Sequence, residues 1–273
     1  MSTAASPDWD ALKTRLRATW IAGDFGQIAK SYATGAEEFI NGLDLRTGMC
    51  VLDVACGTGN LALPAARRGA IVTGVDIAPN LIEQASENAQ REGLDVQFDE
   101  GDVEKLPYAD ASFDAAVTMF GAMFAPRPDM TAAEMTRVVR PGGFIAMANW
   151  TPAGFIGQMF KIVAGHVQQP PGMSSAVLWG VEETVRERLR DGIVGLEVKP
   201  QMVNFKFPFA PAEVVEHFRV YYGPTNKAFN TLDETGQTAL RRDLDELWEK
   251  NNLATDGTTD VEAEYLKVFA VRG

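Results

Sequence analysis

Short runs of apolar residues alternate with stretches of helical spacing between about residues 50 and 150. After residue 78, apolar side chains recur every three or four positions, Pro79 suits the first turn of a helix, and Gly93 suits its end. Strands that alternate with helices in this way form a parallel sheet built of βαβ units. The strands predicted here lie at residues 50–55, 70–75, 96–98, 113–119 and 144–150, the last one entered through a turn at 140–143.

The flanking segments follow other patterns. Residues 7–40 are predicted to be helical because large apolar residues line one face, whereas residues 151–180 have no clean period. Farther along, we predict helices near 182–191, 211–220 and 236–251, and strands near 195–207 and 265–271. The chain therefore divides into an N-terminal helical lid (1–44), a core (45–150), and a C-terminal part (151–273) that completes the sheet and adds helical cap insertions.

Composition narrows the range of partners. Of the 273 residues, 46% are hydrophobic, and no run approaches the roughly 20 apolar residues that a membrane span needs. The net charge of −12 disfavours phosphate backbones and anionic lipid surfaces. Cys50 and Cys56 are the only cysteines, as expected in a reducing compartment. We expect a cytoplasmic protein that binds a small molecule, with neither nucleic acid nor a membrane as partner.

A glycine loop follows the first strand of the core. Gly57-Thr58-Gly59 stands between that strand and a helix, where glycine lets the backbone approach a ligand and the helix start offers free N–H groups. The spacing from Gly57 to Ala62 also satisfies a loose dinucleotide fingerprint. An NAD(P)-dependent oxidoreductase is therefore one hypothesis for this chain.

Asp53 favours a different cofactor. It lies within the apolar strand, where a buried carboxylate needs a cationic or hydrogen-bonding partner. A pyrophosphate would add like charge there, whereas S-adenosylmethionine (SAM) carries an ammonium and a sulfonium group. Asp76, nineteen residues after Gly57, would hold ribose hydroxyls with either cofactor, and Asp102 after the third strand would accept a hydrogen bond from an adenine amino group.

These motifs together resemble the class I SAM-dependent methyltransferases, and most of all the small-molecule branch that includes the ubiquinone and menaquinone enzymes. The resemblance covers about residues 45–150 and rests on 53–59, Asp76, 101–107, 112–114 and 140–143. It implies a Rossmann-like α/β fold with a seven-stranded sheet of order 3-2-1-4-5-7-6 and an antiparallel last strand. It also implies SAM contacts at Asp53, Ala55, Gly57, Gly59, Asp76, Ile77, Asp102, Val103 and Met119, while residues 20–25 resemble an N-terminal lid in which Trp20 closes over SAM.

The methyl acceptor is expected beyond the carboxyl ends of the strands, under the helical cap. We predict a small, largely apolar organic molecule, because aromatic residues gather in the segments that would cover this place. His166 is the candidate base, although none is required when the methyl donor carries a good leaving group. No metal is predicted, since the fourth strand ends without an aspartate. The substrate-binding candidates are Phe124, Trp150, His166, Trp179, Tyr221 and Tyr222. A SAM-binding protein of this fold without turnover remains a further alternative.

Overall fold

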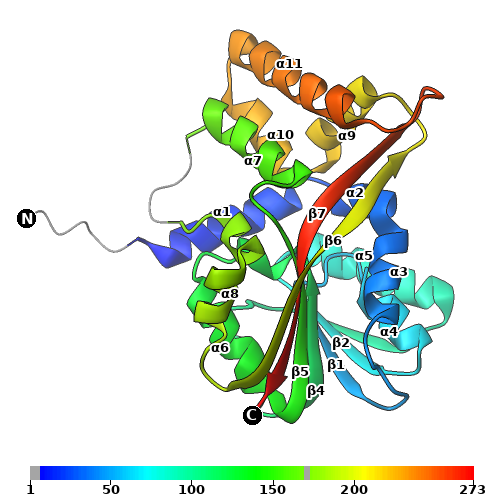
Figure 1. Cartoon of the computed structure of the whole chain (residues 1–273), viewed down its shortest axis with the longest axis vertical. Helices are drawn as coiled ribbons and strands as arrows, with labels where there is room; N and C mark the ends of the chain where they lie inside the picture. The colour runs from blue at the N-terminus through cyan, green and yellow to red at the C-terminus, as the bar shows by residue number, and fades with distance from the viewer. Residues whose placement is uncertain (1–6, 169–172) are drawn as a thin grey trace, which may run out of the picture.

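The computed structural model describes residues 7–168 and 173–273, which form an α/β structure around one seven-stranded sheet (Figure 1). The strand order is β3-β2-β1-β4-β5-β7-β6. Strand β7 runs antiparallel to both of its neighbours, and the other pairs are parallel. The predicted order and the antiparallel last strand are confirmed. The strands are β1 (Cys50–Val54), β2 (Ile71–Asp76), β3 (Val96–Glu100), β4 (Phe113–Met119), β5 (Val139–Trp150), β6 (Ile193–Phe207) and β7 (Thr259–Arg272).

The central strands are buried because helices cover both faces of the sheet. Val51, Leu52 and Val54 of β1 have no exposed surface, as continuous apolar strands of a parallel sheet require. One face carries α3 (Ala33–Asn41), α4 (Ala62–Arg67) and α5 (Pro79–Glu92), and the other carries α6 (Pro128–Val138) and α8 (Glu182–Arg188) (Figure 1). Helix α5 begins at Pro79 and is capped by Gly93, whose φ of 67° is left-handed, as the sequence predicts.

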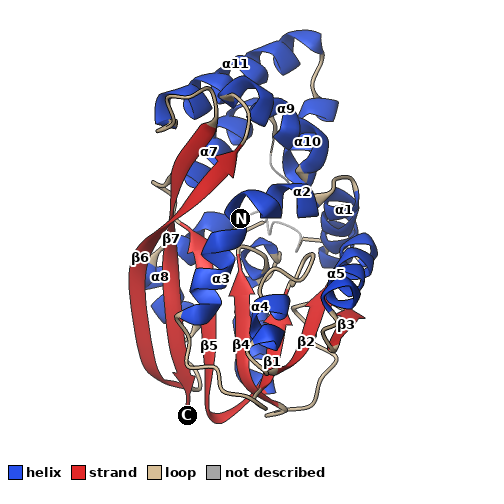
Figure 2. Ribbon diagram, turned by 90° about the vertical axis from the view of Figure 1, so that its right-hand side faces the viewer, coloured by secondary structure: helices blue, strands red, loops and turns tan. Residues whose placement is uncertain are grey.

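A second layer of helices lies beyond the carboxyl ends of the parallel strands (Figure 2). It holds the lid helices α1 (Trp9–Ile21) and α2 (Phe25–Ala29) and the cap helices α7 (Phe155–His166), α9 (Pro211–Tyr221), α10 (Gly223–Thr231) and α11 (Glu234–Asn251). Strands β6 and β7 are the longest of the sheet and extend up to this cap. Three short 3₁₀ helices complete the description: η1 (Lys30–Tyr32), η2 (Ala122–Phe124) and η3 (Ala176–Gly180). None of the helices in the described ranges is long and apolar enough to span a membrane.

Several boundaries differ from the prediction. Strand β5 already starts at Val139, so the predicted turn at 140–143 belongs to the strand. Strand β7 starts at Thr259 instead of residue 265, because its first part pairs with the end of β6 beside the cap. Helix α7 lies in the segment without a clean period, where it buries Phe155, Ile156 and Met159. Helix α10 was missed because Gly223 and Pro224 suggest a turn, although proline also suits a first helical turn.

Candidate cofactor and acceptor site

The loops after β1 and β4 contact each other in an unusual backbone conformation. Ala55 and Phe120 have left-handed φ values of 56° and 61°, which non-glycine residues rarely adopt. A Cβ atom at Gly121 would lie 2.6 Å from the carbonyl oxygen of Ala55, so only glycine permits this approach. Backbone strain of this kind concentrates at functional sites, and here it lies at the carboxyl ends of the two central strands.

Asp53 is buried beside the glycine loop. Only 2% of this residue is exposed. Its carboxylate accepts a hydrogen bond of 2.9 Å from the backbone N–H of Ala62 at the start of α4. Burial, and to a lesser degree the charge of Asp76, raise the pKa of Asp53 to about 7. A cation bound nearby would favour the charged form, so this carboxylate suits a cationic ligand.

Asp76 joins the glycine loop to the end of β2. One carboxylate oxygen accepts from the backbone N–H of Gly57 and the other from that of Ala78, both at 2.9 Å. Burial raises the pKa of Asp76 despite these hydrogen bonds. Each oxygen retains acceptor capacity, and the residue lines the same cavity as Asp53. The side chain is therefore fixed in position and can accept from hydroxyl groups of a ligand.

Asp102 is linked to the lid by a lysine that the sequence analysis did not single out. The Lys13 ammonium of α1 lies 2.7 Å from a carboxylate oxygen of Glu104 and also contacts Asp102. The Glu104 side chain is fully buried and pairs with Arg127 as well, at 2.7 Å. These ion pairs fix α1 over the ends of β2 and β3, where its Arg17 also donates to the carbonyl of Ile77.

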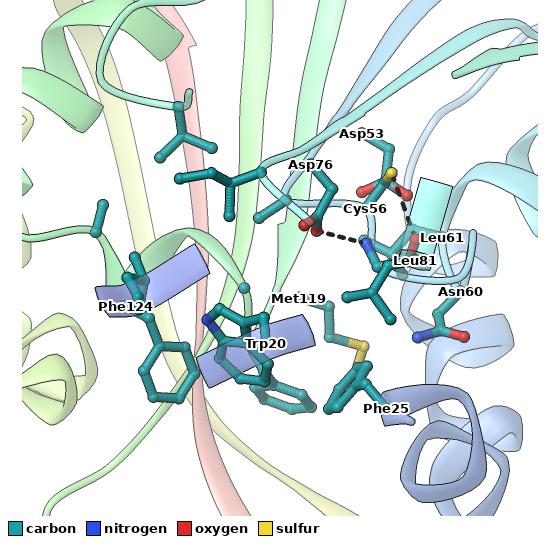
Figure 3. A pocket seen from close by; sticks show the side chains of 18 of the residues that line it. Trp20, Phe25, Asp53, Cys56, Asn60, Leu61, Asp76, Leu81, Met119 and Phe124 are labelled. Carbon is teal, nitrogen blue, oxygen red and sulfur yellow. Dashed lines mark hydrogen bonds between the residues drawn. The ribbon is translucent and has the colours of Figure 1, made fainter. Parts of the chain in front are cut away.

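One cavity joins these features (Figure 3). Its empty volume, counted with the space that opens to solvent, is about 830 Å³. The carboxylates of Asp53 and Asp76 lie on one side of it and the rings of Trp20, Phe25 and Phe124 on the other (Figure 3). Nine of the ten residues predicted to contact the cofactor line it: Trp20, Asp53, Ala55, Gly57, Asp76, Ile77, Asp102, Val103 and Met119. Gly59 does not; a Cβ there would contact Leu63 and Phe98 within the turn.

A second, smaller cavity lies beneath the cap. Its empty volume is about 340 Å³, and nine of its twelve lining residues are aromatic. None of the twelve carries a charge. It shares Trp20, Phe25, Tyr32, Phe120 and Phe124 with the first cavity, so the two spaces are neighbours. The remaining lining residues are Ile28, Trp150, Ile156, Met159, Phe205, Phe218 and Tyr222.

The structure brings together only half of the predicted acceptor residues. Phe124, Trp150 and Tyr222 line the second cavity. His166, Trp179 and Tyr221 line neither of the two cavities.

Each of those three has another environment. His166 lies 2.7 Å from Asp243 between α7 and α11. Trp179 is buried under the guanidinium of Arg188, 4.6 Å from its ring centroid. Tyr221 packs against His217 with ring centroids 4.7 Å apart. Tyr221 is the last residue of α9, whereas Tyr222 follows it in extended backbone, so the two side chains point differently although they are adjacent in sequence.

Tyr32 and Phe205 are two residues of the second cavity that no sequence motif predicted, as are Ile28 and Ile156. Tyr32 lies in the segment predicted to be helical, and Phe205 lies in β6, where both look like ordinary core residues. No sequence pattern marks them, because only the packing of lid, sheet and cap brings them together. Within the described ranges, no group of three or more His, Cys, Asp and Glu side chains is arranged to hold a metal ion.

This chain resembles known proteins in a domain family, in overall sequence and in fold. A family model that describes a methyltransferase domain matches residues 51–143. An uncharacterized protein of Mycobacterium tuberculosis is 33% identical over 259 residues, which cover 93% of each chain. The demethylmenaquinone methyltransferase of Deinococcus radiodurans is 40% identical over 123 residues, 43% of this chain and 50% of that one. The solved structure of a putative methyltransferase from Bacillus halodurans has a TM-score of 0.58 at 17% identity and covers 87% of this chain and 98% of that one.

The matched domain includes the glycine loop, the three acids that line the larger cavity, and the end of β4. The mycobacterial relative extends the similarity into lid and cap, and the sheet order is that of the methyltransferase fold. Sequence, topology and site thus agree, and the chain belongs to the class I SAM-dependent methyltransferases.

Proposed function

We propose that the larger cavity binds SAM and that the protein transfers its methyl group to a small, largely apolar molecule held in the aromatic cavity. The observation that supports this best is the pairing of the two spaces. The larger cavity is lined by three acids and the smaller one by no charged residue. Five aromatic residues line both cavities. A charged cofactor and an apolar acceptor would each find a matching environment within reach of the other.

The residues of the larger cavity fit SAM. Asp53 lacks a cationic partner in its surroundings, as its raised pKa reflects, and would meet the cationic methionine end. Asp76 would accept from the ribose hydroxyls, and Asp102 with Val103 would contact the adenine. When bound, SAM supplies a methyl group on a sulfonium, which is already a good leaving group.

The chain itself would contribute alignment and exclusion of water. Trp20 packs edge-on against Phe25 and Phe124, with ring centroids 5.7 and 5.2 Å apart, and so forms an aromatic wall between lid and cavity. None of the residues that line the aromatic cavity is a histidine or a carboxylate. We therefore assign the rate to orientation in a dry site and not to a protein base. The net charge of −12 supports a small-molecule acceptor over nucleic acid or an anionic membrane.

Titration calorimetry with SAM, S-adenosylhomocysteine, NAD and NADP tests the cofactor part. We expect both SAM and its demethylated product to bind more tightly than either dinucleotide. Binding of NAD or NADP without binding of SAM would refute the proposal. Transfer of label from methyl-labelled SAM to a panel of uncharged ring compounds then tests turnover, and SAM binding with no transfer to any acceptor class would identify a protein that binds SAM without catalysis.

A further inference from the structure

Two tyrosines face the aromatic cavity from different parts of the chain. Tyr32 ends η1 in the lid, and Tyr222 lies between α9 and α10 in the cap. Their exposed fractions are 4% and 6%. The ring of Tyr32 packs edge-on against Phe205 at 5.4 Å, and that of Tyr222 packs against Phe218 at 5.5 Å. Both rings are thus held in place by aromatic neighbours.

Neither hydroxyl donates or accepts a hydrogen bond within residues 7–168 and 173–273. Two other tyrosines have partners: Tyr108 donates to Asp99 at 2.9 Å and Tyr265 to Gln201 at 2.6 Å. Tyr221 also has no hydrogen-bond partner in the described ranges, but it is only partly buried and can bond to water. A buried polar group without a partner is unfavourable and needs an explanation. Among the buried tyrosines of the described ranges, the two without a partner are the two that line the aromatic cavity, which points to a ligand as the missing partner.

The rest of the lining limits what that ligand can be. Among the other lining residues, the side chains with polar groups are Trp20 and Trp150, whose indole N–H groups only donate, and Met159, whose sulfur is a weak acceptor. A carboxylate, phosphate or ammonium group would find no opposite charge there and would be costly to bury. Burial raises the pKa of both tyrosines, so their hydroxyls stay protonated at neutral pH and can donate to an oxygen.

We propose that the aromatic cavity binds an uncharged ring compound that carries an oxygen, as hydroxyl or carbonyl, and that Tyr32 and Tyr222 hydrogen-bond to this oxygen. The inference rests on the proposed function, since it takes this cavity to be the site of the methyl acceptor. It assigns Tyr32 and Tyr222 as substrate-positioning residues. The nine aromatic lining residues suit the faces and edges of a flat ring system.

Equilibrium dialysis with naphthalene, 2-naphthol and 2-naphthoate tests the assignment at pH 7. The wild type should bind 2-naphthol more tightly than naphthalene and 2-naphthoate most weakly. Tyr32→Phe and Tyr222→Phe should each weaken 2-naphthol binding about fivefold and leave naphthalene binding unchanged, as expected for the loss of one hydrogen bond. Tyr221→Phe is the matched control, because this residue lines neither cavity and should change nothing.

Three results would overturn the inference: no binding of any naphthalene, equal binding of naphthalene and 2-naphthol by the wild type, or an unchanged preference in the Tyr32→Phe, Tyr222→Phe double variant. SAM calorimetry on the same preparations separates the two proposals. SAM binding without a preference for the hydroxyl refutes only the role of the tyrosines. A tyrosine-dependent preference without SAM binding refutes the proposed function and supports the tyrosine assignment.

Discussion

The cavity proposed for SAM takes its three acids from the carboxyl ends of β1 and β2 and from the loop after β3. The aromatic cavity is instead assembled from side chains between Trp20 and Tyr222 that come from lid, sheet and cap. In the first, Asp53, Asp76 and Asp102 occupy fixed positions along consecutive βα units. In the second, the lining rings that pack against Phe205 come from three separate elements: Tyr32 from η1, Trp150 from β5 and Phe218 from α9. The site proposed for the cofactor is thus a property of local sequence, whereas the site proposed for the acceptor is a property of tertiary packing.

We expect the largest effect from a substitution of Phe205, which should destabilise the fold without weakening SAM binding and so separate the two regions. This residue is 2% exposed and its ring packs against Tyr32, Trp150 and Phe218. Phe205→Ala should lower the free energy of unfolding by about 3–5 kcal/mol, because it removes a buried ring and leaves a cavity. SAM affinity at a temperature where the variant is folded should stay within about threefold of wild type, since Phe205 does not line the SAM cavity. Chemical denaturation and calorimetry measure both; a large loss of SAM affinity in the folded variant would mean that the two regions are not separable.

We expect the next largest effect, a loss of SAM affinity, from a substitution of Gly121. Its Cβ-free backbone lies against Ala55, and an added Cβ would be 2.6 Å from the carbonyl oxygen and 2.7 Å from the Cβ of that residue. Gly121→Ala should cost about 1–3 kcal/mol of overpacking, which corresponds to roughly five- to hundredfold weaker SAM binding if the loops are forced apart. Gly165→Ala is the control, because a Cβ there meets nothing within 4 Å. Undiminished SAM binding by Gly121→Ala would show that the contact between the loops does not shape the site.

The smallest effect is expected at His166. It pairs with Asp243 at the surface of the cap, and its side chain is 20% exposed. His166→Gln should change the free energy of unfolding by about 1 kcal/mol or less, as expected for the loss of one partly exposed side-chain hydrogen bond. SAM affinity and methyl transfer to any acceptor found should remain within about twofold. A loss of transfer with intact SAM binding would restore His166 as a base.

The strand order could be predicted because the motifs resemble those of the methyltransferases, whereas the glycine loop and the acids around it depend on residues near one another in the chain. Asp76, for instance, is placed by the end of β2 and by its hydrogen bond to Gly57. The positions of Tyr32 and Phe205 could not be predicted in this way. They depend on how far β6 extends along β7, where Phe205 pairs with Val261, and on the rotation of the cap helices. Tyr222 lines the cavity from the extended residue after α9, whereas Tyr221, the last residue of that helix, does not line it.

The proposal that the larger cavity binds SAM depends most on Asp53. Its pKa of about 7 in the folded chain lies above the ordinary value near 4, so its contribution to stability is complete below about pH 4 and is lost as the pH rises through 7. At pH 8 without ligand, Asp53→Asn should therefore melt at a temperature equal to or above that of wild type. Asparagine keeps one oxygen that can accept from the N–H of Ala62, so the fold should be preserved.

Calorimetric titration of SAM into wild type and Asp53→Asn at pH 8 is the most direct test of the central claim that Asp53 meets the cationic end of the cofactor. The variant loses a charge-assisted contact of about 1.5–3 kcal/mol, so its SAM affinity should fall roughly tenfold to a hundredfold while its melting temperature does not fall. Equal SAM affinity in the two folded proteins would contradict the claim.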